Sequence, residues 1–178
     1  MAYGVLIQNA VAAKDVDSYN RSAVCASAVE NGNIVILTGK SATAGQEEVF
    51  TAVVPSTANG LTGVWMAYEP EVVLTAAKYK GLDPDPRNFR NEATKVFSVF
   101  KPQLGDIITL TADNFSAAFS SNTHANATDG QGPKLVWGNS QTASVFSLKY
   151  LATTYISLGT GDISNQRVVA YTCEVVGL

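Results

Sequence analysis

The sequence predicts an all-β protein built as a single β-barrel or β-sandwich domain. Three observations favour this fold class. About ten short runs of apolar and β-branched residues follow one another along the 178-residue chain. Gly, Pro, Asn and Asp interrupt the runs every ~8–12 residues, as turns do in sandwiches and barrels. No run shows the 3.6-residue apolar spacing of a long helix, so we expect helix in less than about 15% of the chain.

Residues 1–20 are predicted to form an extended N-terminal arm, and residues 21–178 are predicted to form the β domain. The arm opens with apolar side chains and then turns polar, without a helical stripe or a long alternation. Apolar side chains so near a chain start need a partner, which the protein's own barrel, a sister subunit or an assembled shell could supply. If they serve the shell, deleting Ala2 to Asn9 leaves the thermal midpoint of the free protein nearly unchanged. The four candidate contact residues are Tyr3, Val5, Leu6 and Ile7.

The β domain begins with a predicted hairpin. Residues 23–29 and 33–38 are apolar runs on either side of Asn31-Gly32, which suits a two-residue type I′ turn because both turn positions need positive φ. Residues 78–92 are expected to form a loop, since each proline in Asp83-Pro84-Asp85-Pro86 disfavours helix in the residue before it. Residues 113–129 are the only segment expected to allow a short helix. Further strands are expected at 48–54, 63–68, 71–75, 95–101, 107–111, 133–137, 144–157 and 166–176.

Composition argues against two classes of partner. The net charge is −3 and the twelve basic residues are scattered, whereas nucleic-acid binding needs clustered Lys and Arg. No apolar run approaches the ~18 residues of a membrane-spanning helix. The N-terminus carries no basic leader followed by an apolar stretch, so we expect synthesis in a cytoplasm.

Motifs that could carry catalysis are incomplete. Thr38-Gly39-Lys40-Ser41 resembles the end of a phosphate-binding loop, but Ile34 stands where that motif needs its first glycine. The run from Gly138 to Thr142 lacks the second glycine of a nucleophile elbow. The only histidine, His124, lies in a polar loop, and Cys25 lies in an apolar run with nothing nearby to lower its pKa. We therefore expect no enzymatic activity.

Metal and cofactor sites are also not expected. One histidine and two distant cysteines cannot supply the ligands of a usual zinc site. Asp83 and Asp85 could bind calcium, but the neighbouring prolines make them better turn formers. Glu69 and Glu71 lie ~6.5–7 Å apart along a strand, near the spacing of glycosidase carboxylates, yet Pro70 between them indicates a strand edge.

The two cysteines, Cys25 and Cys173, are expected to be buried thiols, as is usual in a reducing compartment. A disulfide between them stays open if their strands adjoin in a particle outside the cell. Trp65 and Trp137, with the seven tyrosines, could form a sugar-stacking platform. Both tryptophans lie in apolar runs, which favours core packing.

One region resembles a known family. Residues 85–93 (Asp-Pro-Arg-Asn-Phe-Arg-Asn-Glu-Ala) and residues 97–113, which include the Gly105-Asp106 turn into an apolar strand, resemble proteins encoded beside the major capsid protein in tailed phages of Gram-positive bacteria. The resemblance covers about a third of the chain. It implies a capsid decoration, or cement, protein that binds the assembled shell where capsomers meet. The implied partner is the major capsid protein, the implied location is the exterior of the virion, and a trimer is one possible homo-oligomer.

Two other functions stay open at this point. One is a carbohydrate-binding or adhesion β-sandwich of a phage fibre, which aromatic residues clustered on an exposed face would favour. The other is a tail or head–tail connector subunit, which ring formation by the purified protein would favour.

Overall fold

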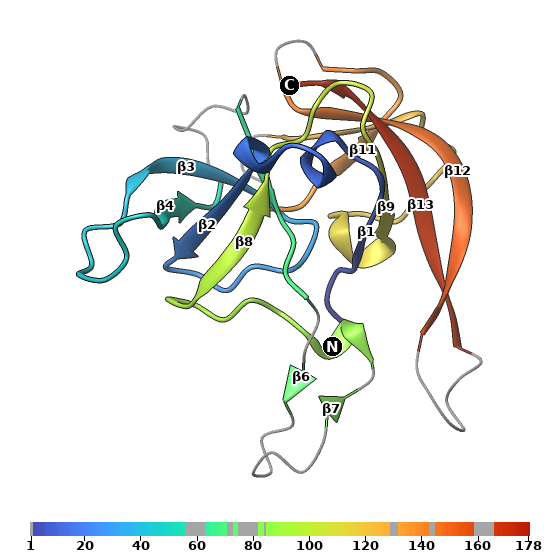
Figure 1. Ribbon diagram of the computed structural model, residues 1–178. Coiled ribbons are helices and arrows are strands. Elements are labelled where there is room, and N and C mark those ends of the chain that lie inside the picture. The colour runs from blue at the N-terminus through green and yellow to red at the C-terminus, as the bar shows by residue number, and fades with distance from the viewer. Residues whose placement is uncertain are drawn as a thin grey trace.

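Strands with antiparallel neighbours dominate the computed structural model, which describes residues 2–55, 63–70, 73–74, 82–83, 85–128, 132–142, 145–158 and 166–178. They form a closed barrel and a six-stranded sheet (Figure 1). The helical elements among the described residues are single 3₁₀ turns, at Ala12–Lys14, Asp17–Tyr19, Pro86–Asn88 and Ala112–Asn114. The predicted all-β fold class is therefore confirmed.

The closed barrel has the strand order β2-β4-β3-β5-β8. β2 and β4 run parallel, and every other neighbouring pair is antiparallel. Its interior is filled mainly by small and β-branched side chains, among them Ala23, Val35, Ala52 and Val99, because so few strands enclose little space. The strands are β2 (Asn20–Cys25), β3 (Ile34–Lys40), β4 (Phe50–Val53), β5 (Trp65–Ala67) and β8 (Val96–Phe100).

The second part is an antiparallel sheet with the order β1-β9-β13-β12-β10-β11. β12 and β13 are its longest strands and form a hairpin. The strands are β1 (Leu6–Ala10), β9 (Ile107–Thr111), β10 (His124–Asn126), β11 (Val136–Gly138), β12 (Ser147–Leu158) and β13 (Gln166–Gly177). A further small pair consists of β6 (Val73–Leu74) and β7 (Leu82–Asp83).

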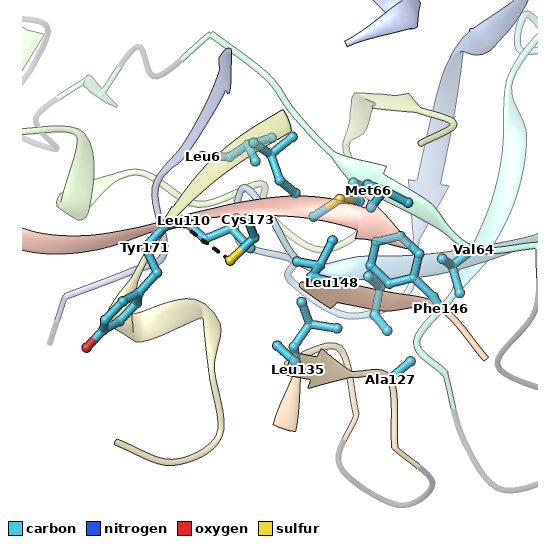
Figure 2. Close-up of a cluster of buried hydrophobic side chains, with 14 of the residues drawn as sticks. Leu6, Val64, Met66, Leu110, Ala127, Leu135, Phe146, Leu148, Tyr171 and Cys173 are labelled. Carbon is cyan, nitrogen blue, oxygen red and sulfur yellow. Dashed lines mark hydrogen bonds between the residues drawn. The ribbon is translucent and has the colours of Figure 1, made fainter. Parts of the chain in front are cut away.

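The main hydrophobic core joins the barrel to the sheet. Leu110, Phe146 and Leu148 come from the sheet and its loops, and Met66 comes from barrel strand β5 (Figure 2). All four side chains are fully buried. Because β5 and β8 point alternate residues into the barrel and into this shared core, the two parts are packed together as one unit.

The segment predicted as an arm is built into the sheet instead. β1 pairs with β9 in the register Leu6↔Leu110, and Val5 and Leu6 are buried at 3% and 2% exposure. The Gly105-Asp106 turn also holds this segment, since Asp106 Oδ1 accepts a hydrogen bond from the Ala12 backbone at 3.0 Å. The apolar side chains at the chain start therefore pack on the protein's own core. Of the four candidate contact residues, Tyr3 is half-buried and only Ile7 is exposed.

The hairpin predicted around Asn31-Gly32 is wrong. β2 pairs with β4 and β8, whereas β3 pairs with β4 and β5, so the two runs are not neighbours. Asn31 is fully buried, and its side chain donates to the Glu69 carbonyl at 2.8 Å and accepts from the Glu69 N–H at 3.1 Å. It thus takes the place of a strand partner for Glu69. The other expected strands each overlap an observed strand, and β10 lies in the segment where a short helix was allowed.

Candidate functional site

The residues considered for catalysis lie apart from one another. His124 is on β10, where its Nδ1 lies 2.9 Å from Thr123 Oγ1, while Cys25 points into the barrel interior. Thr38 to Lys40 end strand β3, and Ser41 Oγ donates to Gln46 Oε1 at 3.1 Å, so this stretch has the geometry of a strand and turn. Within the described residues there is no group of three His, Cys, Asp or Glu side chains that could hold a metal ion.

The loop after β11 is held by Asn126. The Asn126 amide donates to the Ser140 carbonyl at 3.1 Å, and its oxygen accepts from the Thr142 N–H at 3.1 Å and from Ser147 Oγ at 2.7 Å. Asn126 is buried, so these bonds satisfy a polar side chain that would otherwise be costly to bury. The run from Gly138 to Thr142 is therefore a loop that hydrogen bonds to Asn126 hold in place.

Of the carboxylates considered in the sequence, Glu69 and Asp85 have structural partners. Glu69 Oε2 accepts a hydrogen bond from the Ser98 N–H at 2.7 Å. Asp85 caps the Arg87 N–H at 2.9 Å and forms an ion pair with the Arg87 guanidinium at 2.6 Å, and this hydrogen bonding lowers the pKa of Asp85. The side chains of Glu71 and Asp83 lie outside the described residues.

The two cysteines do not form a disulfide. Both are free and buried, and they belong to different hydrophobic clusters: Cys25 to the barrel interior and Cys173 to the main core. The Cys173 thiol donates weakly to the Tyr171 carbonyl at 3.8 Å, as Figure 2 shows. Burial raises the pKa of Cys173 from an ordinary value of 9.0 to about 12, so the reactive thiolate does not form there at neutral pH.

We predict that iodoacetamide at pH 8 leaves Cys173 unmodified in the folded protein and modifies it fully after denaturation. Mass spectrometry of tryptic peptides measures both states. Because the folded thiol keeps a proton that the unfolded chain loses above about pH 9, this group also makes stability fall as the pH rises from 9 toward 12. Rapid alkylation of Cys173 in the native protein would show that its site opens.

Trp137 belongs to a cluster of aromatic rings on one face of the sheet. Its ring stacks on Phe115 at a centroid distance of 4.2 Å, and Phe119, Tyr150 and Tyr171 lie around it at 5.0–6.4 Å. Phe115, Trp137 and Tyr171 are buried, while Phe119 and Tyr150 are half-buried. Trp65 is half-buried against the barrel interior. Most of these rings therefore serve the core, as the apolar runs around both tryptophans indicated.

The far ends of β12 and β13 form a two-stranded ribbon that projects from the sheet (Figure 1). β12 pairs with β10 only through residues 147–149, and β13 pairs with β9 only through residues 170–174. Beyond these points the two strands pair with each other, in the register Tyr155↔Val169. In the described part of the chain, the outer edge of β12 from Leu151 onward has no strand beside it.

This ribbon exposes apolar side chains on the uncharged outer part of β12. Leu151 is 43% exposed and Tyr155 is 54% exposed, and the run Leu-Ala-Thr-Thr-Tyr-Ile-Ser-Leu at 151–158 holds no charged residue. The Arg167 guanidinium lies 5.1 Å from the centre of the Tyr155 ring. An isolated two-stranded ribbon is marginally stable in water, and exposed edges normally carry charges or proline. The ribbon therefore has the properties of a contact surface.

A groove of about 690 Å³ lies on the barrel where it approaches β1. Side chains of β2, β3, β4 and β8 line it, and Gln8 of β1 contributes from the sheet. The lining is mixed, with Arg21, Lys40 and Glu48 as its charged groups and Phe50 and Tyr68 among its aromatic groups. Neither the groove nor the ribbon was found from the sequence. The uncharged run at 151–158 is the one local signal that could have indicated the ribbon.

The comparisons with known proteins do not assign the chain to a family. No protein-family model, no curated protein and no solved structure matches the chain. Among the described residues, no helix has the length and apolar composition that a membrane crossing requires.

Proposed function

We propose that this chain is a structural virion protein that binds the outer surface of an assembled phage capsid and stabilises it. The projecting β12–β13 ribbon is the observation that carries the proposal. Its exposed Leu151 and Tyr155 lie on a stretch of strand edge, residues 151–158, that holds no charged residue, which suits contact with another protein better than contact with water. The resemblance of residues 85–93 and 97–113 to capsid decoration proteins supplies the class of partner, the major capsid protein.

The mechanism would be mechanical. Each copy would bury about 800 Å² against the shell, the usual patch of one partner in a specific interface. Many copies on one shell, or linked copies in a trimer, raise the total affinity without strengthening any single contact. A rigid β body suits this role, because the hydrophobic core that joins barrel and sheet transmits load between distant contacts.

The alternative of a carbohydrate-binding fibre domain has weaker support. Sugar-stacking platforms present aromatic rings to solvent, whereas Phe115, Trp137 and Tyr171 are buried here. A tail or connector subunit would also use a projecting ribbon, so the experiment must separate it from a decoration protein. Ring formation by the purified protein, without capsid binding, is the outcome that would identify a connector.

We predict that the protein co-sediments with empty cognate capsids and that Leu151→Glu/Tyr155→Glu weakens this binding at least about tenfold. The two carboxylates would have to be buried without partners in the contact, which is costly. The matched control is Leu104→Glu, because Leu104 is 65% exposed in a turn away from the ribbon. The control should bind like the parent protein, and the variants should keep the parent's thermal midpoint within a few degrees.

Failure of the parent protein to co-sediment with its cognate capsids would contradict the decoration function itself. If the parent and the ribbon variant bind capsids equally well, the capsid is still the partner but the ribbon is not the contact surface.

A further inference from the structure

Two cationic side chains lie against one aromatic ring in the groove on the barrel. Lys40 Nζ is 4.5 Å from the centre of the Phe50 ring, and the Arg21 guanidinium carbon is 6.0 Å from it. Among the described residues, neither cation forms an ion pair, and the hydrogen bond of Arg21 is to the adjacent Asn20 carbonyl at 2.8 Å. Two positive charges without ion-pair partners beside the same ring make this part of the groove attractive to anionic groups.

The rest of the lining selects the kind of anion. Glu48 also faces the groove and has no ion pair in the described part of the chain, so the site is not uniformly positive. A polyphosphate or nucleic acid would be repelled by Glu48 and by the net charge of −3. A peptide carries carboxylates for the two cations and backbone N–H groups for Glu48, so it matches both signs of charge.

The groove also has the walls and size that a peptide needs. Tyr68, 37% exposed, packs edge-on against Phe100, and Phe50 is half-buried beside the two cations. Aromatic surfaces of this kind pack against the apolar parts of a peptide while their polar neighbours fix its orientation. A volume of about 690 Å³ falls within the range of sites that hold a drug-sized ligand, which corresponds to a few residues of extended chain.

We infer that this groove binds a short acidic peptide segment of a partner protein, with Arg21 and Lys40 pairing its carboxylates. The inference deepens the proposed function, on which it rests for the identity of the partner, by naming the chemistry of the capsid segment that would enter the groove. The binding chemistry itself can be tested without a capsid.

The test is an NMR titration of the full-length ¹⁵N-labelled protein with the capped peptide acetyl-Glu-Phe-Glu-amide at low salt. The neutral acetyl-Gln-Phe-Gln-amide and the basic acetyl-Lys-Phe-Lys-amide serve as comparison probes. We expect saturable shifts of amides in β2, β4 and β8 with the acidic peptide only. Arg21→Gln/Lys40→Gln should weaken this binding by about tenfold, and 0.5 M NaCl should weaken it further.

The matched control, Lys95→Gln/Lys149→Gln, removes the same charge at two exposed residues that do not line the groove, and it should bind like the parent. Absence of saturable shifts with the acidic peptide would overturn the inference, as would equal loss in the control variant. Tighter binding of inorganic phosphate at the same amides would overturn the peptide as ligand. If the protein binds the acidic peptide in the groove but fails to co-sediment with capsids, the peptide site stands and the capsid is not the partner.

Discussion

Removal of Ala2 to Asn9 is expected to lower the thermal midpoint by about 10 °C or more. The deletion takes away most of β1 and the buried side chains of Val5 and Leu6, each of which contributes roughly 1.5–3 kcal/mol through burial. The total loss is then about 5 kcal/mol. Each kcal/mol lowers the thermal midpoint of a domain of this size by about 2–4 °C. Differential scanning calorimetry of the shortened protein measures the effect.

The backbone of this segment adds to the expected loss. The Val5 N–H donates to Thr111 Oγ1 at 3.0 Å, and the Val5 carbonyl accepts from the Thr111 N–H at 3.1 Å. The buried Asn114 amide also donates to the Val5 carbonyl at 3.2 Å. Deleting the segment leaves these buried polar groups without partners, which costs more than the net value of the bonds.

Two point variants separate the core role from a surface role. Leu6→Ala should cost about 2–5 kcal/mol, as large-to-small changes in a core do, whereas Ile7→Ala should cost little because Ile7 is 39% exposed. A shortened protein that melts with the parent would mean that β1 contributes no stability and that residues 1–20 behave as the free arm which the sequence alone suggested.

Strand positions were predictable here because they depend on local pattern. The alternation at 95–101 and the Gly105-Asp106 turn before 107–111 correspond to β8 and β9, whose alternate side chains face different surroundings. The 12-residue strands β12 and β13 were also visible as long β-branched runs. Side-chain alternation is a property of a single strand, so it can be read without knowing the neighbour.

Strand partners were not predictable in the same way. The Asn31-Gly32 pair has the composition of a hairpin turn, but tertiary contacts decided otherwise: Asn31 bonds to the Glu69 backbone, and Gly32 packs against Leu110. From the sequence, the apolar residues at the chain start could have packed against the protein's own core, a sister subunit or the shell. The pairing of β1 with β9 shows that they pack against the protein's own core.

The candidate site was even less accessible from the sequence. Arg21, Lys40 and Phe50 come from three strands, and each alone looks like an ordinary surface or strand residue. Their proximity depends on the parallel pairing of β2 with β4, which no local pattern encodes. A composition-based argument could only state that basic residues are scattered along the chain.

Gly32→Ala is expected to destabilise the protein by about 3 kcal/mol. Gly32 has φ +85°, where an L-residue costs roughly 1–2 kcal/mol. A Cβ at this position would also lie 2.7 Å from Leu110 Cδ2 and 2.8 Å from Asn114 Nδ2, in a fully packed core, and overpacking of this kind costs about 1–3 kcal/mol. Urea unfolding followed by tryptophan fluorescence gives the free energy of unfolding for the variant and the parent.

The chain contains a control that isolates the packing part of this cost. Gly45 has φ +80°, nearly the same backbone conformation, but no atom lies within 4 Å of the position its Cβ would take. Gly45→Ala should therefore cost only the backbone part, about 1–2 kcal/mol. The difference between the two variants measures how firmly Leu110 and Asn114 are held where the loop at 29–33 enters the main core. Equal costs for both variants would mean that these side chains move aside freely, and that the junction between barrel and sheet is looser than its burial indicates.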